Sequence, residues 1–346
     1  MEFKSREIVV KFRHPQKGFE EVEVGSEVRW DPLTGRAGRI TAHRTLDIPV
    51  ERGLPNISGI VEESRKGCVF CPPLLDVFTP KLPGGIFSTD KLDHKGTVLF
   101  PNLFPYGAAS AVCIFGRDLH FIEIGKIGAE LQVATFTNCV EYIRRYRGHN
   151  PALLYSSITQ NYLPSSGGSF VHPHFQVQVD DFPAQHQFDM LDGARKYFQE
   201  TDSNFWEDLI AEEKRRGERW IGRTGGWAWY TPFAPKGFKE AAAALPNRKC
   251  VTECSEAELL DLCRGIENVE RYYSRAGCNS FNFALYSMST PDPAWTLNFR
   301  ILIRANWQPW YRNDRSFHEV MLGEAAVPEP PERIAEHLRP YFKGEK

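Results

Sequence analysis

The sequence has no apolar run long enough to cross a bilayer, and residues 1–7 lack the apolar stretch of a secretory signal peptide. We therefore expect a cytoplasmic protein that does not insert into membranes. Its 42 Lys and Arg residues nearly balance its 44 Asp and Glu residues, so the formal net charge is only −2. This balance gives no bulk attraction to nucleic acid, which is not an expected partner, and any anionic ligand must be held by local groups.

Cysteine is also scarce, because 8 residues in a chain of 346 are too few for a disulfide-stapled scaffold. A close pair, Cys68 and Cys71, is more typical of a metal site in a reducing compartment. Two prolines follow it and disfavour the helix that usually begins at a redox pair. We expect zinc, with a reversible disulfide as the alternative. Candidates for the other two ligands are His120 and His172, while His94 is weaker because its loop is charged.

The order of the expected elements suggests a weak internal duplication. A pattern of strand, strand, helix and strand occurs twice, with a boundary near residue 182, which divides the chain into residues 1–182 and 183–346. The two halves have no long linker between them and are expected to pack as one body. The expected strands are 7–13, 20–29, 38–45, 97–104, 110–115 (with 120–124 as a candidate continuation), 152–159, 170–179, 219–223, 227–232, 280–287 and 295–304, and the expected helices are 127–147, 185–217, 255–275 and 331–342.

The most informative motif is His172-Pro173-His174-Phe175-Gln176 on an expected strand. Because side chains alternate across a strand, both histidines and Gln176 should project from one face. Polar groups on an otherwise apolar strand are costly to bury without partners. A neutral imidazole is nucleophilic near pH 7 and leaves a phosphoryl group readily. We therefore expect His174 to attack a phosphate, with Gln176 donating to a phosphate oxygen. A histidine pair that only packs or forms hydrogen bonds is the open alternative.

A loop rich in serine and glycine precedes this motif and covers residues 161–169. Glycine lets backbone amides approach an anion closely, so the loop is a candidate phosphate nest. Its candidate binding residues are Ser165, Gly167, Gly168 and Ser169.

Together these residues resemble the galactose-1-phosphate uridylyltransferase branch of the histidine-triad (HIT) superfamily. The resemblance is strong in the first half of the chain and thin in the second. It implies an α+β fold of two tandem HIT-like repeats, with a mainly antiparallel sheet and packed helices. It also places four ligands of a structural zinc at Cys68, Cys71, His120 and His172. The substrate-binding residues that the resemblance implies, besides those of the loop, are Arg44, Phe100, Asn102 and Asn161.

The activity implied by the resemblance is a two-step, ping-pong nucleotide exchange. His174 would attack the α-phosphate of a nucleotide sugar, expel a sugar 1-phosphate and hold the nucleotide until an acceptor phosphate takes it. The expected partners are thus a nucleotide sugar and a sugar phosphate, in carbohydrate and more specifically galactose metabolism. Members of this family are commonly dimers, so a homodimer is expected.

Some positions depart from the family pattern. Leu103 replaces an Asp that binds ribose hydroxyls, and Asp47 replaces a second phosphate-contacting Arg. The paired histidines of the second repeat are missing from residues 295–300. These differences leave the base and the sugar open. One alternative is therefore a phosphorylase of a nucleotide sugar or of a dinucleoside polyphosphate. Another is a zinc-stabilised protein that binds nucleotide without turnover.

Overall fold

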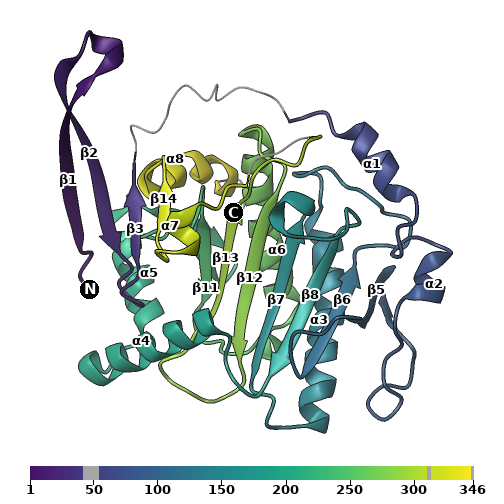
Figure 1. Cartoon of the computed structure of the whole chain (residues 1–346). Coiled ribbons are helices and arrows are strands. Elements are labelled where there is room, and N and C mark those ends of the chain that lie inside the picture. The colour runs from purple at the N-terminus through teal and green to yellow at the C-terminus, as the bar shows by residue number, and fades with distance from the viewer. Residues whose placement is uncertain (42–53, 310–312, 344–346) are drawn as a thin grey trace.

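The computed structural model describes residues 1–41, 54–309 and 313–343 (Figure 1). Its main feature is a ten-stranded sheet with the order β4-β5-β6-β8-β7-β12-β13-β11-β10-β9. Every neighbouring pair in this sheet is antiparallel. The strands are β4 (Leu92–His94), β5 (Thr97–Pro101), β6 (Ala109–Ile114), β7 (Tyr155–Tyr162), β8 (His174–Asp180), β9 (Trp220–Thr224), β10 (Trp227–Tyr230), β11 (Ala241–Leu245), β12 (Phe281–Met288) and β13 (Leu297–Ile303). The predicted α+β class with a mainly antiparallel sheet is confirmed.

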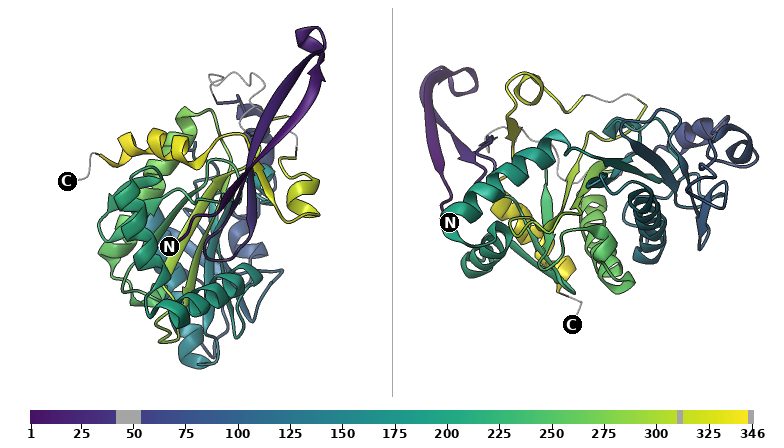
Figure 2. Two further views of the ribbon diagram at one scale, coloured as in Figure 1. Left: turned by 90° about the vertical axis from the view of Figure 1, so that its left-hand side faces the viewer. Right: turned by 90° about the horizontal axis from the view of Figure 1, so that it is seen from below.

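The strand order is the same on the two sides of the β7–β12 contact. In chain order, each side has three strands, then a long helix, then two strands. The last strand of each side is inserted in the sheet between the third and the fourth, so β8 lies between β6 and β7, and β13 lies between β11 and β12. The two helices, α3 (Ala129–His149) and α6 (Glu256–Arg275), lie side by side on one face of the sheet (Figures 1 and 2). The division near residue 182 stays a prediction, and this matching order supports it.

The opposite face of the second half is covered by α4 (Gln185–Thr201) and α5 (Phe205–Arg216). The sequence predicted one helix over this stretch, which is wrong. Asp202 ends α4 in the left-handed conformation, with a φ of 54°. Asn204 then starts α5, because its side chain accepts hydrogen bonds from the amides of Trp206 and Glu207.

Three other expectations are corrected. Helix α1 (Ser58–Arg65) lies in what was expected to be a loop, and residues 120–124 do not continue β6. Strand β11, an alanine-rich segment, was not expected at all. All five of its residues are buried between β10 and β13. Its strand conformation therefore comes from tertiary context, which overrides the low strand propensity of alanine. Of the expected strand 38–45, β3 (Ala37–Ile40) is present, and residues 42–45 lie outside the described residues.

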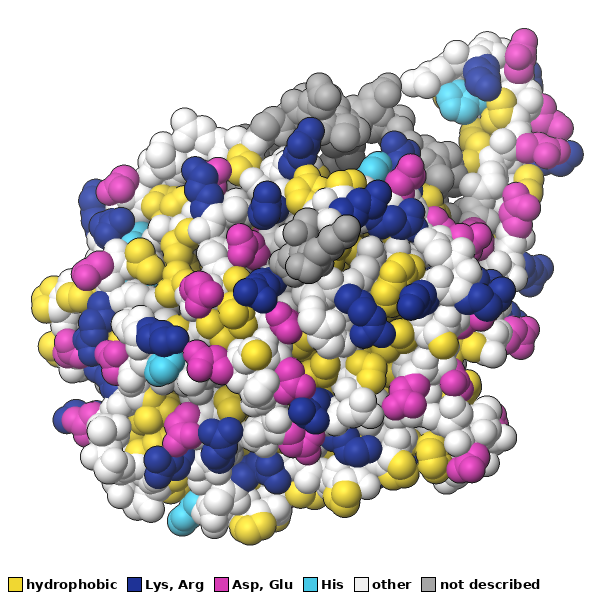
Figure 3. Space-filling model, turned by 180° about the vertical axis from the view of Figure 1, so that it is seen from behind, with side chains coloured by type: hydrophobic (Ala, Val, Ile, Leu, Met, Phe, Trp, Pro, Cys, Tyr) yellow, Lys and Arg dark blue, Asp and Glu magenta, His cyan; other side chains and the backbone are white. Residues whose placement is uncertain are grey.

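An N-terminal ribbon, β1 (Ser5–His14) and β2 (Glu20–Trp30), projects from the body of the molecule (Figures 1 and 3). At its base β2 pairs with β3, which pairs in parallel with β14 (Ala325–Val327). Along the ribbon Val10 is 54% exposed and Phe12 is 41% exposed. The face in Figure 3 otherwise carries acidic and basic side chains intermixed. The remaining helices are α2 (Leu74–Phe78), α7 (Phe317–Val320) and α8 (Pro331–Phe342). No helix among the described residues is both long and apolar enough to span a membrane.

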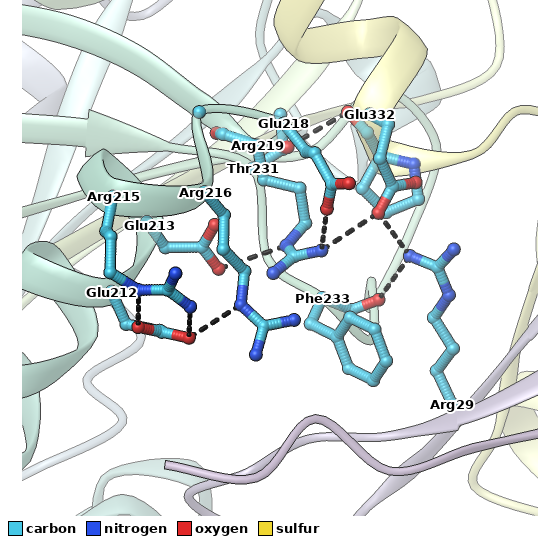
Figure 4. A network of polar contacts seen from close by, with 12 residues as sticks. Arg29, Glu212, Glu213, Arg215, Arg216, Glu218, Arg219, Thr231, Phe233 and Glu332 are labelled. Atoms are coloured by element: carbon cyan, nitrogen blue, oxygen red, sulfur yellow. Dashed lines mark hydrogen bonds and ion pairs between the residues drawn. The ribbon is translucent and has the colours of Figure 1, made fainter.

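A buried ion-pair network fixes the ribbon to the body (Figure 4). The side chain of Arg219 is only 2% exposed and contacts Glu213 of α5 at 3.0 Å and Glu332 of α8 at 3.1 Å. Glu332 also accepts a 2.6 Å hydrogen bond from Arg29 at the end of β2. Three stretches that are distant in sequence, namely β2, residues 213–219 and α8, are therefore joined through charged groups with little access to water.

Candidate active site and metal centre

The two cysteines and two histidines predicted as zinc ligands come together at one end of the sheet. One potential ligand atom from each of Cys68, Cys71, His120 and His172 lies within 4.8 Å of all the others. We call these four residues the Cys–His cluster. His94, the weaker candidate on β4, is not part of it. His172 lies just before β8 rather than on it, since the strand begins at His174.

Hydrogen bonds orient both imidazoles of the Cys–His cluster. His172 donates through Nε2 to the carbonyl of Gly116 at 2.7 Å, so its Nδ1 carries the lone pair. The Ser64 hydroxyl donates to a backbone carbonyl, so its oxygen accepts from Nε2 of His120 at 3.0 Å. The Nδ1 atoms of His172 and His120 then face Sγ of Cys71 at 3.4 and 3.3 Å.

This arrangement fits a cation. One thiol hydrogen cannot satisfy two imidazole lone pairs, whereas a metal ion among the four ligand atoms satisfies all of them. Burial lowers the pKa of His172 to about 4, and burial with nearby Arg65 lowers that of His120, so both rings are neutral, as ligation requires. Burial and Cys68 raise the pKa of Cys71 to about 12, so a thiolate here requires a bound cation.

An aromatic side chain connects the Cys–His cluster to the proposed nucleophile. Phe70 lies between the two cysteines in sequence and is buried in a small core with residues of β5 and β6. Its ring centroid is 5.4 Å from that of His174, with an interplanar angle of 72°. No local pattern indicates this contact, because it joins segments about a hundred residues apart.

His174 begins β8 and pairs with Ile114 of β6. Its Nδ1 lies 2.8 Å from the carbonyl oxygen of His172 and must donate to it, because a carbonyl only accepts. The lone pair is therefore on Nε2, which has no hydrogen-bond partner among the described residues and is not one of the fully buried polar atoms. Burial also lowers the pKa of this ring. His174 is thus a neutral imidazole with its basic nitrogen available.

Gln176 lies on the same face of β8 as His174, two residues further along. It is half-buried between Val112 of β6 and Thr159 of β7. Its amide forms no side-chain hydrogen bond with a described residue, so it is free to meet a ligand.

In the predicted phosphate nest, residues 165–169, some of the backbone amides already form hydrogen bonds within the loop. The amides of Ser166 and Gly167 donate to Leu163 and Pro164 inside a 3-10 turn, whereas those of Gly168 and Ser169 have no described acceptor. Gly167 has a φ of 99°, which favours glycine there. The buried hydroxyl of Ser165 also lacks a partner among the described residues.

A set of polar residues that the sequence analysis missed supports this loop from the second half of the chain. Asn282 of β12 donates to Asn161 at 2.6 Å and to the carbonyl of Ser166 at 3.1 Å. Arg304 donates to the Asn282 side chain at 2.7 Å and is held by Asp314 at 2.7 and 2.8 Å. The one local feature of the sequence that could have indicated this contact is Asn282, a polar residue between two phenylalanines of an expected strand.

The other predicted substrate contacts are less direct. Phe100 is 2% exposed and packs on Phe70, with 5.4 Å between ring centroids. The side chain of Asn102 accepts a 3.0 Å hydrogen bond from the amide of Phe104, within a loop where Leu103 is 62% exposed. Arg44 lies outside the described residues.

Comparison with known proteins identifies the fold. No family model matches the chain. A protein from Archaeoglobus fulgidus, described as uncharacterized, is 29% identical over 340 residues. The matched region covers 98% of this chain and 98% of that protein. An ADP-glucose phosphorylase from Arabidopsis thaliana with bound ADP-glucose matches with a TM-score of 0.69 and 16% identity, over 91% of this chain and 98% of that chain. A uridylyltransferase structure matches with a TM-score of 0.65 and 17% identity, over 91% and 98%. The chain therefore shares the fold of the uridylyltransferase and of the ADP-glucose phosphorylase. The predicted resemblance is confirmed at this level.

Three groups of predicted residues of the first half come together within this fold. The Cys–His cluster, His174 with Gln176, and the 165–169 loop with Asn161 lie at or beside the start of β8 or the end of β7. Phe100 is a buried support, and Arg44 lies outside the described residues.

Proposed function

We propose that the chain is a nucleotidyltransferase in which His174 transiently carries the nucleotide. The observation that carries this proposal is the hydrogen bond from Nδ1 of His174 to the carbonyl of His172, which leaves the Nε2 lone pair free on a neutral ring. Such a nitrogen needs no general base before it attacks phosphorus.

In the first step, Nε2 of His174 forms a bond to the α-phosphorus of a nucleotide sugar. The bond from that phosphorus to the bridging oxygen breaks, and the sugar 1-phosphate leaves with the electron pair. In the second step, a phosphate oxygen of the acceptor attacks the same phosphorus, and the electron pair of the N–P bond returns to Nε2. The exchange is therefore ping-pong and consumes no other reactant.

The remaining groups of the site would position the phosphates. The Gln176 amide and the free amides of Gly168 and Ser169 can donate to phosphate oxygens, with Arg44 as a further candidate. Donors that are already oriented where negative charge develops lower the barrier most. Asn282 and Arg304 do not carry the reaction in this scheme but hold the loop in place.

We propose that the metal is zinc, held by Cys68, Cys71, His120 and His172. Four protein ligands close the coordination shell, so zinc would supply structural stability rather than a reactive site. It would fix Phe70 and the start of β8, and with them the ring of His174. A redox role for the two cysteines is less favoured, because two imidazole lone pairs are directed at Cys71, as in a metal site.

For the substrates we propose a nucleotide sugar and a sugar 1-phosphate, as in a hexose-1-phosphate uridylyltransferase of galactose metabolism, in a cytoplasmic homodimer. A second candidate is phosphorolysis of a nucleotide sugar by inorganic phosphate. Leu103, which is exposed, stands where the resembled uridylyltransferases keep an Asp for the ribose, so it leaves the nucleotide of either candidate reaction open. The structural neighbour that binds ADP-glucose is likewise a phosphorylase.

An acceptor assay separates these candidates. Purified protein is incubated with UDP-glucose or ADP-glucose, and with galactose 1-phosphate or inorganic phosphate, and the release of glucose 1-phosphate is measured. We expect release in at least one combination and none from His174→Asn. Full activity in His174→Asn would refute the covalent mechanism. Nucleotide binding without release in any combination would favour a binding protein.

A further inference from the structure

The N-terminal ribbon of β1 and β2 has one apolar face and one charged face. The two strands pair residue by residue over the whole length of β1, without a bulge. Paired residues of an antiparallel ribbon lie on the same face, and every second residue belongs to that face. The apolar face therefore consists of Ile8, Val10 and Phe12 of β1 with Val22 and Val24 of β2. None of these five side chains is buried, although a two-stranded ribbon is only marginally stable in water by itself. The uncovered apolar face points to a partner.

The outer edge of β1 is open to a further strand. β1 is the last strand of its sheet and lies on the side of the ribbon away from the body (Figures 1 and 2). No strand among the described residues pairs with this edge. Residues 5–14 contain no proline, glycine or bulge, which are devices that usually protect an edge strand from pairing. A regular edge of this kind can take up an added strand through its main-chain groups.

The sequence of β1 is complementary to itself when reversed about Val10. When a strand pairs with a second copy of itself about a two-fold axis, residues equally far from the axis lie opposite each other. With the axis at Val10, Ile8 lies opposite Phe12 of the second copy, so the apolar faces of the two ribbons meet. On the charged face, Glu7 lies opposite Arg13 of the second copy. Each of these pairs occurs twice.

Neighbouring registers match less well. An axis between two residues would place the apolar face of one ribbon beside the charged face of the other. An axis at Val9 would place Glu7 opposite Lys11, whose ammonium group is already paired with Glu23 at 2.6 Å. The Val10 register is therefore favoured by both faces.

The two charges that the Val10 register pairs have no ionic partner within the described residues. Neither Glu7 nor Arg13 has an oppositely charged group within 4.0 Å there. Within the ribbon, Glu7 lies opposite Glu27, and like charges directly opposite each other destabilise a sheet. A second copy would bring a guanidinium group to the outer side of Glu7.

We propose that two copies of the chain associate by antiparallel pairing of their β1 strands about a two-fold axis at Val10. The two ribbons then form one four-stranded sheet, in the order β2-β1-β1-β2. Pairing over residues 6–14 of each copy gives a contact about 30 Å long, at roughly 3.4 Å per residue. A contact between strand edges is small, so the dimer should dissociate on dilution. This inference names the surface of the homodimer proposed above and rests on that part of the proposed function alone.

Disulfide trapping of Val10→Cys in the full-length protein tests the pairing. At the axis the two Cα atoms would be about 4.5–5.5 Å apart, which is within the range that a disulfide bridges. None of the eight native cysteines lies in the ribbon, so the wild type reports the background. We expect Val10→Cys to form a covalent dimer in a glutathione redox buffer, measured by non-reducing electrophoresis and intact mass, with the linkage mapped to the two substituted positions.

Val9→Cys is the matched control, because Val9 is 50% exposed and Val10 is 54% exposed. In the proposed register the two Cα atoms at position 9 would be about 8 Å apart, too far for a disulfide without movement of the backbone. We expect Val10→Cys to cross-link at least about tenfold faster than Val9→Cys.

Charge reversal tests the register without cysteine. In sedimentation equilibrium, Glu7→Arg and Arg13→Glu should each raise the dissociation constant of the dimer about tenfold, because each creates two like-charge pairs. The double variant restores opposite charges and should return the constant to within about threefold of wild type. Glu7→Arg also places a cation opposite Glu27, which favours the ribbon itself, so a weaker dimer in this variant does not come from loss of the ribbon.

Four results separate the possibilities. Fast cross-linking at position 10 with rescue by the double reversal supports the pairing. A wild-type dimer that Val10→Cys does not trap, or equal cross-linking at positions 9 and 10, overturns the pairing and leaves the homodimer to another surface. A wild-type monomer at every concentration overturns both, and leaves the β1 edge for a different protein. Transfer at His174 is measured separately in the acceptor assay, so its failure is distinguishable from all of these.

Discussion

Gly265 lies in the middle of α6, at the point where that helix packs closely on β10. A Cβ added at this position would lie 2.1 Å from Cζ2 of Trp229 and 2.3 Å from its Cε2. Ordinary carbon–carbon contacts are about 3.5–4.0 Å, so helix and ring would have to separate by about 1.4 Å. We predict that Gly265→Ala destabilises the protein, although the same change in an open helix is stabilising.

The magnitude follows from what holds Trp229. Its ring is fully buried between Phe299 and Phe342, and its Nε1 donates to the hydroxyl of Thr224 at 2.9 Å. Overpacking such a site costs about 1–3 kcal/mol, and breaking a buried hydrogen bond adds about 1 kcal/mol or more. Replacing a helical glycine by alanine returns about 1 kcal/mol. We therefore expect a net loss of about 1–3 kcal/mol in the free energy of unfolding.

Urea denaturation followed by tryptophan fluorescence measures this loss. Gly148→Ala is the matched control, because Gly148 lies in the last turn of α3 and an added Cβ would have no neighbour within 4 Å. The control should leave stability unchanged or raise it by up to about 1 kcal/mol. A Gly265→Ala variant as stable as the wild type would refute the packing argument.

Four further outcomes are expected. Cys71→Ala should lose the bound zinc in elemental analysis and lower the Tm, whereas Cys254→Ala, which removes a half-buried cysteine outside the Cys–His cluster, should keep the metal. Glu332→Gln removes a carboxylate shared by two arginines and should cost about 2–4 kcal/mol in urea denaturation, and an unchanged midpoint would contradict the structural role of that network. Asn282→Ala should lower the rate of nucleotide transfer about tenfold in the acceptor assay with little loss of zinc, because it releases the 165–169 loop; wild-type turnover would show that the loop needs no such support. The folded-state pKa of Lys236, about 8, lies below its ordinary value of 10.5. Between pH 8 and pH 10.5 the unfolded chain therefore binds more protons than the folded one, and the free energy of unfolding should rise with pH. Lys236→Met should remove that rise, and urea curves at several pH values that are parallel in the two proteins would disprove the assignment.

Local motifs were enough to predict which candidate residues of the first half the structure brings together. The spacing of Cys68 and Cys71 places two thiols in one turn of chain, and the alternation along residues 172–176 places His174 and Gln176 on one face. These features depend on neighbours in sequence, so the sequence analysis could use them. The helix at 331–342 was also predicted with its observed bounds, because its apolar spacing is regular.

The residues that were missed depend on long-range pairing. Asn282 reaches Asn161 only because β7 and β12 are neighbours in the sheet, and no local pattern sets that register. The contact of Phe70 with His174 likewise joins segments far apart in the chain. The break between α4 and α5 could have been predicted from Asn204, because asparagine is a strong helix N-cap and this one lies in the middle of the expected helix 185–217.

The central claim is tested most directly by the mass of the intact chain after exposure to a panel of nucleotide sugars and removal of free ligand. The account predicts that one donor adds the mass of a single nucleoside monophosphate residue to the wild type, that the adduct maps to His174, and that an acceptor phosphate removes it. Persistent absence of an adduct with every donor while turnover proceeds, or an adduct on another residue, would contradict it.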